Sequence, residues 1–258
     1  MNGRTMLVLV ALLLAVGAVC GQTQLDIEQV IAQACRRDSL NRADVHDLVM
    51  SAESYGRTLR GDGTIKEEKL FFKTYYFKDS LFRTEFHQYY LNGQLQGAEE
   101  LQKQVKEDEK RRKEDHNRDA SVMPVELFYP RNRQHYIYSM PGIEVRQGYT
   151  CYHVKAECLE ESENLLEGDF WFEVDDFNLV EADFHPARLP TTIRKLNMTM
   201  VYGPAVTGYW LPMSFCLEGR GKALLVIKFN FEVEEKYTRH KINVGLTDDY
   251  FSEDANED

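Results

Sequence analysis

Apolar and polar residues alternate with a period of two over most of the chain between His46 and Ile242, which is the pattern of β-strands. Short clusters of glycine, aspartate, asparagine and proline interrupt the alternation and mark turns. The pattern therefore predicts about ten strands, mostly joined as hairpins. Three of them are expected between residues 46 and 91, and the others at 133–140, 143–159, 167–175, 179–186, 191–203, 207–219 and 222–237.

The turns between the later strands follow from the same signals. We expect them at Pro141-Gly142, near 160–164, at Asp175-Asp176, at Pro190, at Gly203-Pro204 and at Gly219-Arg220-Gly221. Two of the strands are then strongly apolar on one face, because side chains two apart point the same way. The shared faces are Tyr209, Leu211, Met213, Phe215 and Leu217 in one strand, and Leu225, Ile227, Phe229, Phe231 and Val233 in the next.

Two segments depart from the alternation. Residues 25–37, LDIEQVIAQACRR, place apolar side chains at helical spacing, with acidic residues early and basic residues late, so we assign an N-terminal helix within 22–45. Residues 97–120 are more than half charged, with both signs mixed and i,i+4 pairs of the favoured order. This insert is expected to be a solvated helix, with a docking arm or a cavity lid as the alternative.

The element order predicts a mainly β (α+β) fold. Parallel strands would need helical crossovers, which this chain lacks between its strands, so the sheet is expected to be antiparallel. A sheet of about ten long strands twists and curls, which gives a large half-open barrel with an N-terminal helix and one charged helical insert. Its apolar concave face must be filled by side chains, helices or a ligand. Since only one amphipathic helix is evident, we expect a cavity there.

The stretch 167–186, EGDFWFEVDDFNLVEADFHP, combines aromatic residues with many carboxylates. Folding it about Phe177 pairs Val174 with Val180, Phe172 with Ala182 and Phe170 with Phe184, all on one apolar face. The opposite face then carries Glu173 across from Glu181, a repulsive pair that is tolerable only in water. We therefore expect the carboxylates to form the wet face and the turn of a hairpin.

The N-terminus has the layout of a secretory signal peptide: one arginine, an apolar run from Met6 to Val19, and small residues before a cleavage point after Gly21. We expect export, to the periplasm if the source is bacterial and by secretion otherwise. Acylation of Cys20 as a membrane tether is the alternative. The acidic tail, 247–258, is expected to be disordered. In an oxidising compartment Cys216 could form a disulfide with Cys151 or with Cys158, and free buried cysteines are the alternative.

Composition and motifs narrow the function further. A formal net charge of −11 argues against nucleic-acid binding and against a protein held on an anionic membrane by basic patches. The chain has no HExxH pair, no Gly-x-Ser-x-Gly elbow, no P-loop and no Gly-x-Gly-x-x-Gly after a strand, and its seven histidines are scattered. We therefore expect a non-enzymatic protein with no cofactor, no catalytic residues and no metal site.

Three motifs lie within residues 46–242: SYGRTLRGDGTIKEEKLFFKTYYFKDSLFRTEF, the hairpin GDFWFEVDDFNLVEADF, and YWLPMSFCLEGRGKALLVIKFNFEVEEKYTRHKI. With the signal peptide and the N-terminal helix, they resemble the LolA-like family of periplasmic lipoprotein carriers and outer-membrane lipoprotein-sorting proteins. The resemblance implies an unclosed barrel whose concave face, under a helical lid, shelters acyl chains. The expected partner is a lipid or an acylated protein, with an envelope protein as a further possibility.

We accordingly expect an exported binding protein that holds an acyl chain or another apolar ligand against the concave face. Burial of each CH₂ group would contribute about 0.8 kcal/mol to binding. The alternative is an envelope interaction or signalling module that docks through 97–120 and has a filled core. The residues expected to line the ligand site are Phe170, Phe172, Phe184, Phe215, Phe229 and Phe231.

Overall fold

The computed structural model describes residues 25–114, 124–206, 208–223 and 227–251, with the backbone alone considered at 111–114, 223 and 227–229. The expected signal peptide with Cys20, and residues 252–258 of the expected tail, lie outside the described residues. Within the described residues, no helix combines the length and the apolar character needed to cross a membrane.

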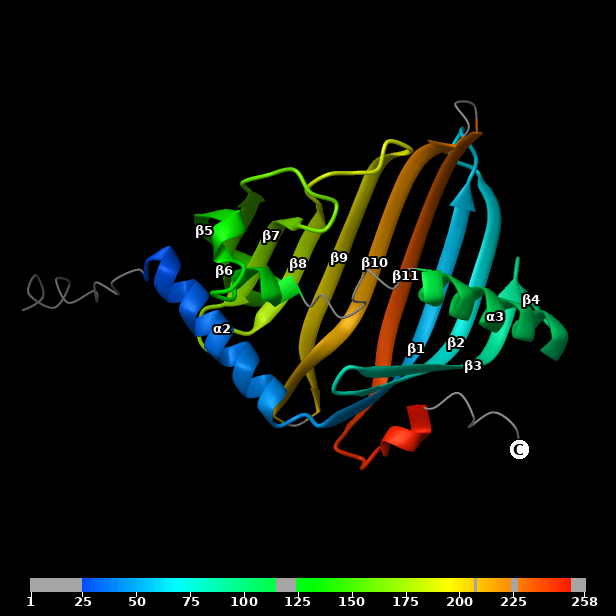
Figure 1. Cartoon of the computed structure of the whole chain (residues 1–258), viewed down its shortest axis with the longest axis horizontal. Coiled ribbons are helices and arrows are strands. Elements are labelled where there is room, and N and C mark those ends of the chain that lie inside the picture. The colour runs from blue at the N-terminus through cyan, green and yellow to red at the C-terminus, as the bar shows by residue number, and fades with distance from the viewer. Residues whose placement is uncertain (1–24, 115–123, 207, 224–226, 252–258) are drawn as a thin grey trace, which may run out of the picture.

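One antiparallel sheet of eleven strands forms the body of the protein, in the order β4-β3-β2-β1-β11-β10-β9-β8-β7-β6-β5 (Figure 1). The sheet is a meander in which the first strand pairs with the last, so β1 lies beside β11. The strands are β1 (Asp47–Leu59), β2 (Ile65–Lys78), β3 (Leu81–Leu91), β4 (Gln94–Leu95), β5 (Tyr136–Arg146), β6 (Tyr149–Cys158), β7 (Leu166–Glu173), β8 (Leu179–Pro186), β9 (Ile193–Val206), β10 (Tyr209–Ala223) and β11 (Ile227–Ile242).

The sheet is curled and does not close, since β4 and β5 are left as its two edges. The helices are α2 (Ile27–Ala43) and α3 (Ala98–Glu114), and three 3₁₀ turns are η1 (Pro124–Phe128), η2 (Arg133–His135) and η3 (Asp248–Phe251). Both helices lie on the same side of the sheet, with α2 over β5–β8 and α3 beside β3 (Figure 1). The predicted fold class, a half-open antiparallel barrel with an N-terminal helix and a charged helical insert, is confirmed.

Helix α2 begins as its sequence dictates. The Asp26 side chain accepts from the backbone of Gln29, and the Gln29 side chain accepts from the backbone of Asp26, which completes a capping box. The helix buries Val30, Ile31 and Ala34 against the sheet. Its other half is fixed by Asn178 in the β7–β8 turn, whose side-chain oxygen accepts from Arg37 Nε at 2.9 Å and Asn41 Nδ2 at 3.2 Å. These two contacts attach α2 to the β7–β8 turn.

Three predicted turns were wrong. Pro141-Gly142 lies inside β5 at a bulge, and the turn comes later at Gln147-Gly148, both with positive φ. Proline is tolerated there because β5 is an edge strand. Gly203-Pro204 and Gly219-Arg220-Gly221 also lie inside strands, β9 and β10. Both Gly203 and Gly219 make room for a neighbouring side chain instead. A Cβ added at Gly203 would lie 3.2 Å from Met213, and one added at Gly219 would lie 2.2 Å from the Phe231 ring.

The expected pairing in the 167–186 hairpin was also wrong by two residues. Phe170 pairs with Ala182, and an irregularity between Trp171 and Phe172 brings Phe172 opposite Leu179. Val180 therefore leaves the apolar face and packs with Cys151 and Trp171 on the other side of the sheet. A bulge adds one residue to one strand, and this changes which face the following side chains occupy.

Glu181 is consequently not on a wet face beside Glu173. It lies opposite Trp171 and is buried, and its carboxylate accepts from Gln147 Nε2 at 2.8 Å. A second irregularity, between Pro212 and Ser214, separates Leu211 from the face of Phe215 and Leu217, so the five residues expected to share one face of β10 do not.

The four described cysteines, Cys35, Cys151, Cys158 and Cys216, are free thiols, so the possible disulfide is not formed among them. Cys216 lies on β10 and the other two candidates lie on β6, four strands away. At about 4.8 Å per strand that is roughly 19 Å, beyond the reach of a disulfide. Burial raises the pKa of Cys151 to about 11, which keeps this thiol protonated and poorly nucleophilic.

The tail is ordered for longer than expected. Residues 248–251 form η3, where Tyr250 donates to Glu85 at 2.7 Å and lies under the Arg83 guanidinium. In the charged insert, α3 covers residues 98–114, and Gln104 accepts from Lys69 Nζ at 3.3 Å. This contact places α3 on the same side of β2 as Lys69.

Candidate functional site

The face of the sheet that carries the helices, here called the inner face, is the candidate site. Strand registers identify its residues, because partners across a ladder point the same way. Its buried residues gather at two ends. The helix-covered cluster lies over β5–β9 under α2 and η1, and the ion-pair cluster lies over β1, β2 and β11.

The helix-covered cluster is densely packed. Phe128 of η1 is fully buried and meets Phe170 and Phe172 edge to face, with ring centroids 4.9 and 5.3 Å apart. Helix α2 adds its buried apolar side chains from the same side. The sequence PVELF after the charged insert thus supplies filler that the periodicity did not reveal, because a five-residue 3₁₀ turn is too short to show a helical repeat.

The ion-pair cluster contains two buried charges. Lys73 Nζ lies 2.9 Å from Glu235 Oε1, and the two side chains are only 12% and 11% exposed. The Glu235 carboxylate also accepts from the hydroxyls of Tyr75 and Tyr237 at 2.9 Å. The Lys73 ammonium is surrounded by the rings of Phe71, Tyr75 and Phe86, each with its centroid between 5.5 and 5.6 Å away. Lys73 and Glu235 thus form one hydrogen-bonded ion pair without net charge on an otherwise apolar face.

The electrostatics of this pair favour the ionised carboxylate. Burial raises the pKa of Glu235. The Lys73 ammonium and the hydrogen bonds from Lys73, Ser54 and Tyr237 lower this pKa by more than burial raises it, so it lies below its ordinary value. Burial, followed by the nearby Glu235 charge, raises the pKa of Tyr237 well above its usual range. Glu235 is thus an acceptor and Tyr237 a donor at any physiological pH.

Between the two clusters lies a central strip of apolar side chains on β9, β10 and β11. In one row Met198 is opposite Leu217, and Leu217 is opposite Val233, and in the next row Leu196, Gly219 and Phe231 follow one another across the strands. The five apolar side chains of the strip are half-buried, in contrast to those of the packed clusters. The strip is defined as Leu196, Met198, Leu217, Phe231 and Val233.

Glycine shapes the central strip at two points. The Phe231 ring lies over Gly219, where it occupies the place of a side chain. Gly56 on β1 is opposite Val233, and an added Cβ there would meet nothing closer than 4.0 Å. The strip therefore has open space above Gly56, beside Val233.

The six phenylalanines expected to line a ligand fall into three groups. Phe170, Phe172 and Phe184 are 0%, 1% and 5% exposed inside the helix-covered cluster. Phe215 and Phe231 are half-buried, the first beside the ion-pair cluster and the second within the central strip. The side chain of Phe229 lies outside the described residues. Sequence reasoning missed Lys73 and Glu235 as members of this face, although their alternation with Phe71, Tyr75, Val233 and Tyr237 could have placed them there.

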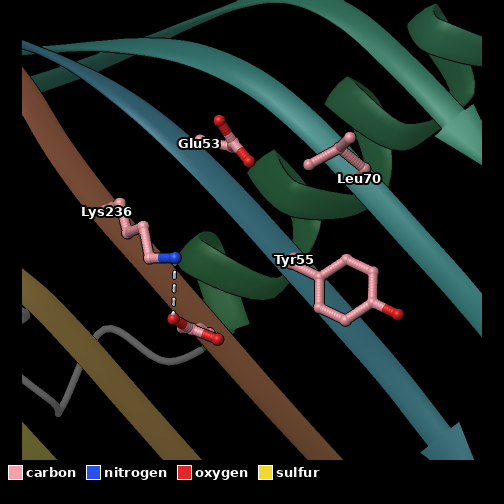
Figure 2. A pocket seen from close by; sticks show the side chains of 5 residues that line it. Glu53, Tyr55, Leu70 and Lys236 are labelled. Carbon is pink, nitrogen blue, oxygen red and sulfur yellow. Dashed lines mark ion pairs between the residues drawn. The ribbon is translucent and has the colours of Figure 1, made fainter.

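The opposite, outer face carries a shallow depression over β1, β2 and β11, lined by Glu53, Tyr55, Leu70, Glu234 and Lys236. Figure 2 shows these side chains on the strands, with the Lys236–Glu234 ion pair at 3.3 Å and α3 behind the sheet. Tyr55 donates its hydroxyl hydrogen to Glu68. The depression mixes both charges with little apolar surface, so its chemistry does not suit an acyl chain.

A second polar group on the outer face involves His153. Its two ring nitrogens lie 3.1 Å from Glu144 and 2.6 Å from Asp169, and the ring stacks on Trp171. These contacts connect β5, β6 and β7 on one side of the sheet. No group of three or more histidine, cysteine, aspartate or glutamate side chains in the described part of the chain is arranged to hold a metal ion.

Among known proteins, similarity to this chain is found in solved structures of low sequence identity. No protein-family model matches the chain, and no curated protein matches its sequence. Among solved structures, a DUF1329 family protein from Desulfovibrio piger is similar at a TM-score of 0.41 and 14% identity, over 90% of this chain and 99% of that one. A LolA superfamily protein from Nitrosomonas europaea is similar at a TM-score of 0.40 and 13% identity, over 89% and 99%.

A putative outer-membrane lipoprotein-sorting protein domain from Vibrio parahaemolyticus is similar at a TM-score of 0.39 and 10% identity, over 86% of this chain and 97% of that one. In this chain the inner face is divided into two filled ends and the central strip.

Proposed function

We propose that the protein is an exported, non-enzymatic carrier that holds an acyl chain, from a lipid or an acylated protein, against the central strip. The observation that supports this is the half-burial of Leu196, Leu217 and Val233 between two clusters that are themselves well packed. The expected signal peptide supports export, and the similar lipoprotein-sorting and LolA superfamily structures are in keeping with a lipid or lipoprotein cargo.

The chemistry of the strip fits an alkyl chain. Its side chains are aliphatic, methionine or phenylalanine, which offer dispersion contacts and no fixed polar geometry. The ion pair beside it carries no net charge, and its hydrogen bonds are already made. Binding would then follow from burial, at about 0.8 kcal/mol for each CH₂ group removed from water. Of the phenylalanines predicted to line the ligand, Phe231 belongs to the central strip and Phe215 lies next to it on β10.

Leu217→Glu is expected to lower the affinity for a fluorescent fatty acid at least tenfold, because an unpaired carboxylate in the strip must be desolvated by the bound chain. Gly56→Phe should do the same by filling the open space beside Val233, with no added charge. The measurement is a fluorescence titration of each purified variant, with thermal unfolding as the test of folding.

Ser214→Glu is the matched control. Ser214 lies on β10 like Leu217, but opposite Lys236 on the outer face, so the same charge there should leave affinity unchanged. Equal binding by all variants would contradict a site on the central strip. A wild-type protein that carries no lipid on native mass spectrometry and binds no fatty-acid probe would contradict the carrier function itself and would favour docking through 97–120.

A further inference from the structure

Basic residues collect at one end of five neighbouring strands, at the top of Figure 1. The end residues of these strands, 59–66, 191–195, 219–223 and 227–230, hold seven basic residues and one acidic residue, although the whole chain has a net charge of −11. We name the described side chains of this group the basic rim. It consists of Arg60, Lys66, Arg194, Lys195, Arg220 and Lys222.

The rim is one continuous row. Leu59 is opposite both Ile65 and Asn230, Asn230 is opposite Arg220, and Arg220 is opposite Lys195, so the ends of β2, β1, β11, β10 and β9 lie side by side. Five strands at about 4.8 Å spacing give a row roughly 19 Å long. Five of the six rim side chains are exposed, and Lys222 is half-buried.

Like charges face each other across this row. Arg220 is directly opposite Lys195, and Lys222 is directly opposite Lys228 in the backbone register. Directly opposed like charges destabilise a sheet, so folding alone does not favour this arrangement. Lys195 has an ion pair with Glu218 at 2.9 Å, but Lys66, Arg194, Arg220 and Lys222 have none with any residue in the described ranges.

An exposed apolar side chain lies at one end of this row. Ile65, at the start of β2, is 44% exposed next to Lys66 and close to Arg60. A row of basic residues that ends beside an exposed apolar side chain matches a surface of anionic headgroups above acyl chains. An acidic protein would also satisfy the charges, but it would need an apolar pocket placed to receive Ile65, whereas a bilayer offers an apolar medium at every point.

We propose that the basic rim docks the protein on a bilayer that contains anionic lipid, with the strand ends against the headgroups. The surrounding negative charge of the protein does not prevent this, because salt screens charges more than about 8 Å away. Acidic surfaces of the protein are repelled only when they come within that distance of the headgroups, so the orientation with the basic rim against the membrane is favoured. This docking does not depend on whether the central strip carries an acyl chain.

The test is co-sedimentation of the purified protein with vesicles of phosphatidylcholine alone or mixed with phosphatidylglycerol. The wild type should bind the anionic vesicles and not the neutral ones, and raised salt should weaken binding. Arg194→Glu combined with Arg220→Glu should lower binding at least tenfold, since each basic residue near such a surface contributes roughly fivefold. Ile65→Ser should also weaken it, without a change in salt dependence.

Lys106→Glu combined with Lys241→Glu is the matched control, because it reverses two exposed charges away from the rim. This control should bind anionic vesicles like the wild type. All variants keep the same N-terminus, so any contribution from its apolar run cancels. Equal binding by the rim variant, or no preference of the wild type for anionic vesicles, would overturn the proposal, the second outcome pointing to an acidic protein partner. Fatty-acid titration of the same variants tests the carrier function separately.

Discussion

Phe128→Ala is expected to lower the free energy of unfolding by about 3–5 kcal/mol, the range for removing a fully buried phenylalanine. Phe128 is 0% exposed and contacts Phe170, Phe172 and Tyr138, so the substitution leaves a cavity at the centre of the helix-covered cluster. Neither α2 nor the strands can close that cavity easily, because both are held by their own packing and hydrogen bonds. The measurement is equilibrium unfolding in urea.

Ile137→Ala is the control for this prediction. Ile137 is a large apolar residue on the edge strand β5 and is 57% exposed, so its truncation should change stability by less than about 0.5 kcal/mol. A loss below about 1 kcal/mol for Phe128→Ala would mean that η1 does not fill this end of the inner face. Phe170, Phe172 and Phe184 would then be available to a ligand, as the sequence alone suggested.

Lys73→Met is expected to cost about 3–5 kcal/mol, because it leaves the Glu235 carboxylate buried without its cation. Combining it with Glu235→Leu should recover most of that loss, since an apolar pair of similar volume needs no desolvation. Lys236→Met is the matched control. Its ion pair with Glu234 involves side chains that are 65% and 53% exposed, and such pairs contribute only about 0–1 kcal/mol.

Lys73→Met should also reverse the sign of the contribution that Glu235 makes to the pH dependence of stability. In the wild type the pKa of Glu235 is lowered on folding, so this group stabilises the protein above its unfolded pKa, and the contribution is lost as pH falls through the folded pKa. Without Lys73, burial dominates and raises the folded pKa above the unfolded one. The charged form then destabilises the fold at neutral pH, and the penalty disappears as pH falls.

The loss caused by Lys73→Met should therefore be smaller at about pH 4 than at about pH 7. Urea unfolding of both proteins at the two pH values measures this difference. A loss that is the same at both values would contradict the assignment of Lys73 as the main stabilising partner of the Glu235 carboxylate. Failure of Glu235→Leu to recover stability in the double variant would instead indicate that Lys73 stabilises the fold mainly through its aromatic neighbours.

Alternation placed Phe170, Phe172, Ala182 and Phe184 on the inner face correctly, because a shift of two residues leaves every side chain on its own face. It misplaced Val180, because the irregularity beside Trp171 adds a single residue and so exchanges the faces. Local sequence carries no clear signal for such a bulge, which is decided by how neighbouring strands fit.

Glycine and proline misled the turn assignments for a related reason. Gly219 looked like a turn residue but lies within β10, where its missing side chain makes room for the Phe231 ring from the next strand. Pro141 lies within β5, which tolerates proline because that strand is at an edge. In both cases the reason for the residue lies in a neighbour that is distant in sequence or in the position of the strand within the sheet.

The sequence by itself determined the strands, the N-terminal helix, the charged insert and the antiparallel curled sheet, because these follow from local periodicity and from the lack of crossover helices. The tertiary structure alone decided how the inner face is occupied. Phe128 of η1 packs on Phe170 of β7, and Lys73 meets Glu235 because the first strands lie beside the last. Leu217 is left half-buried between these two clusters. Such contacts join residues far apart in the chain, so no local pattern encodes them.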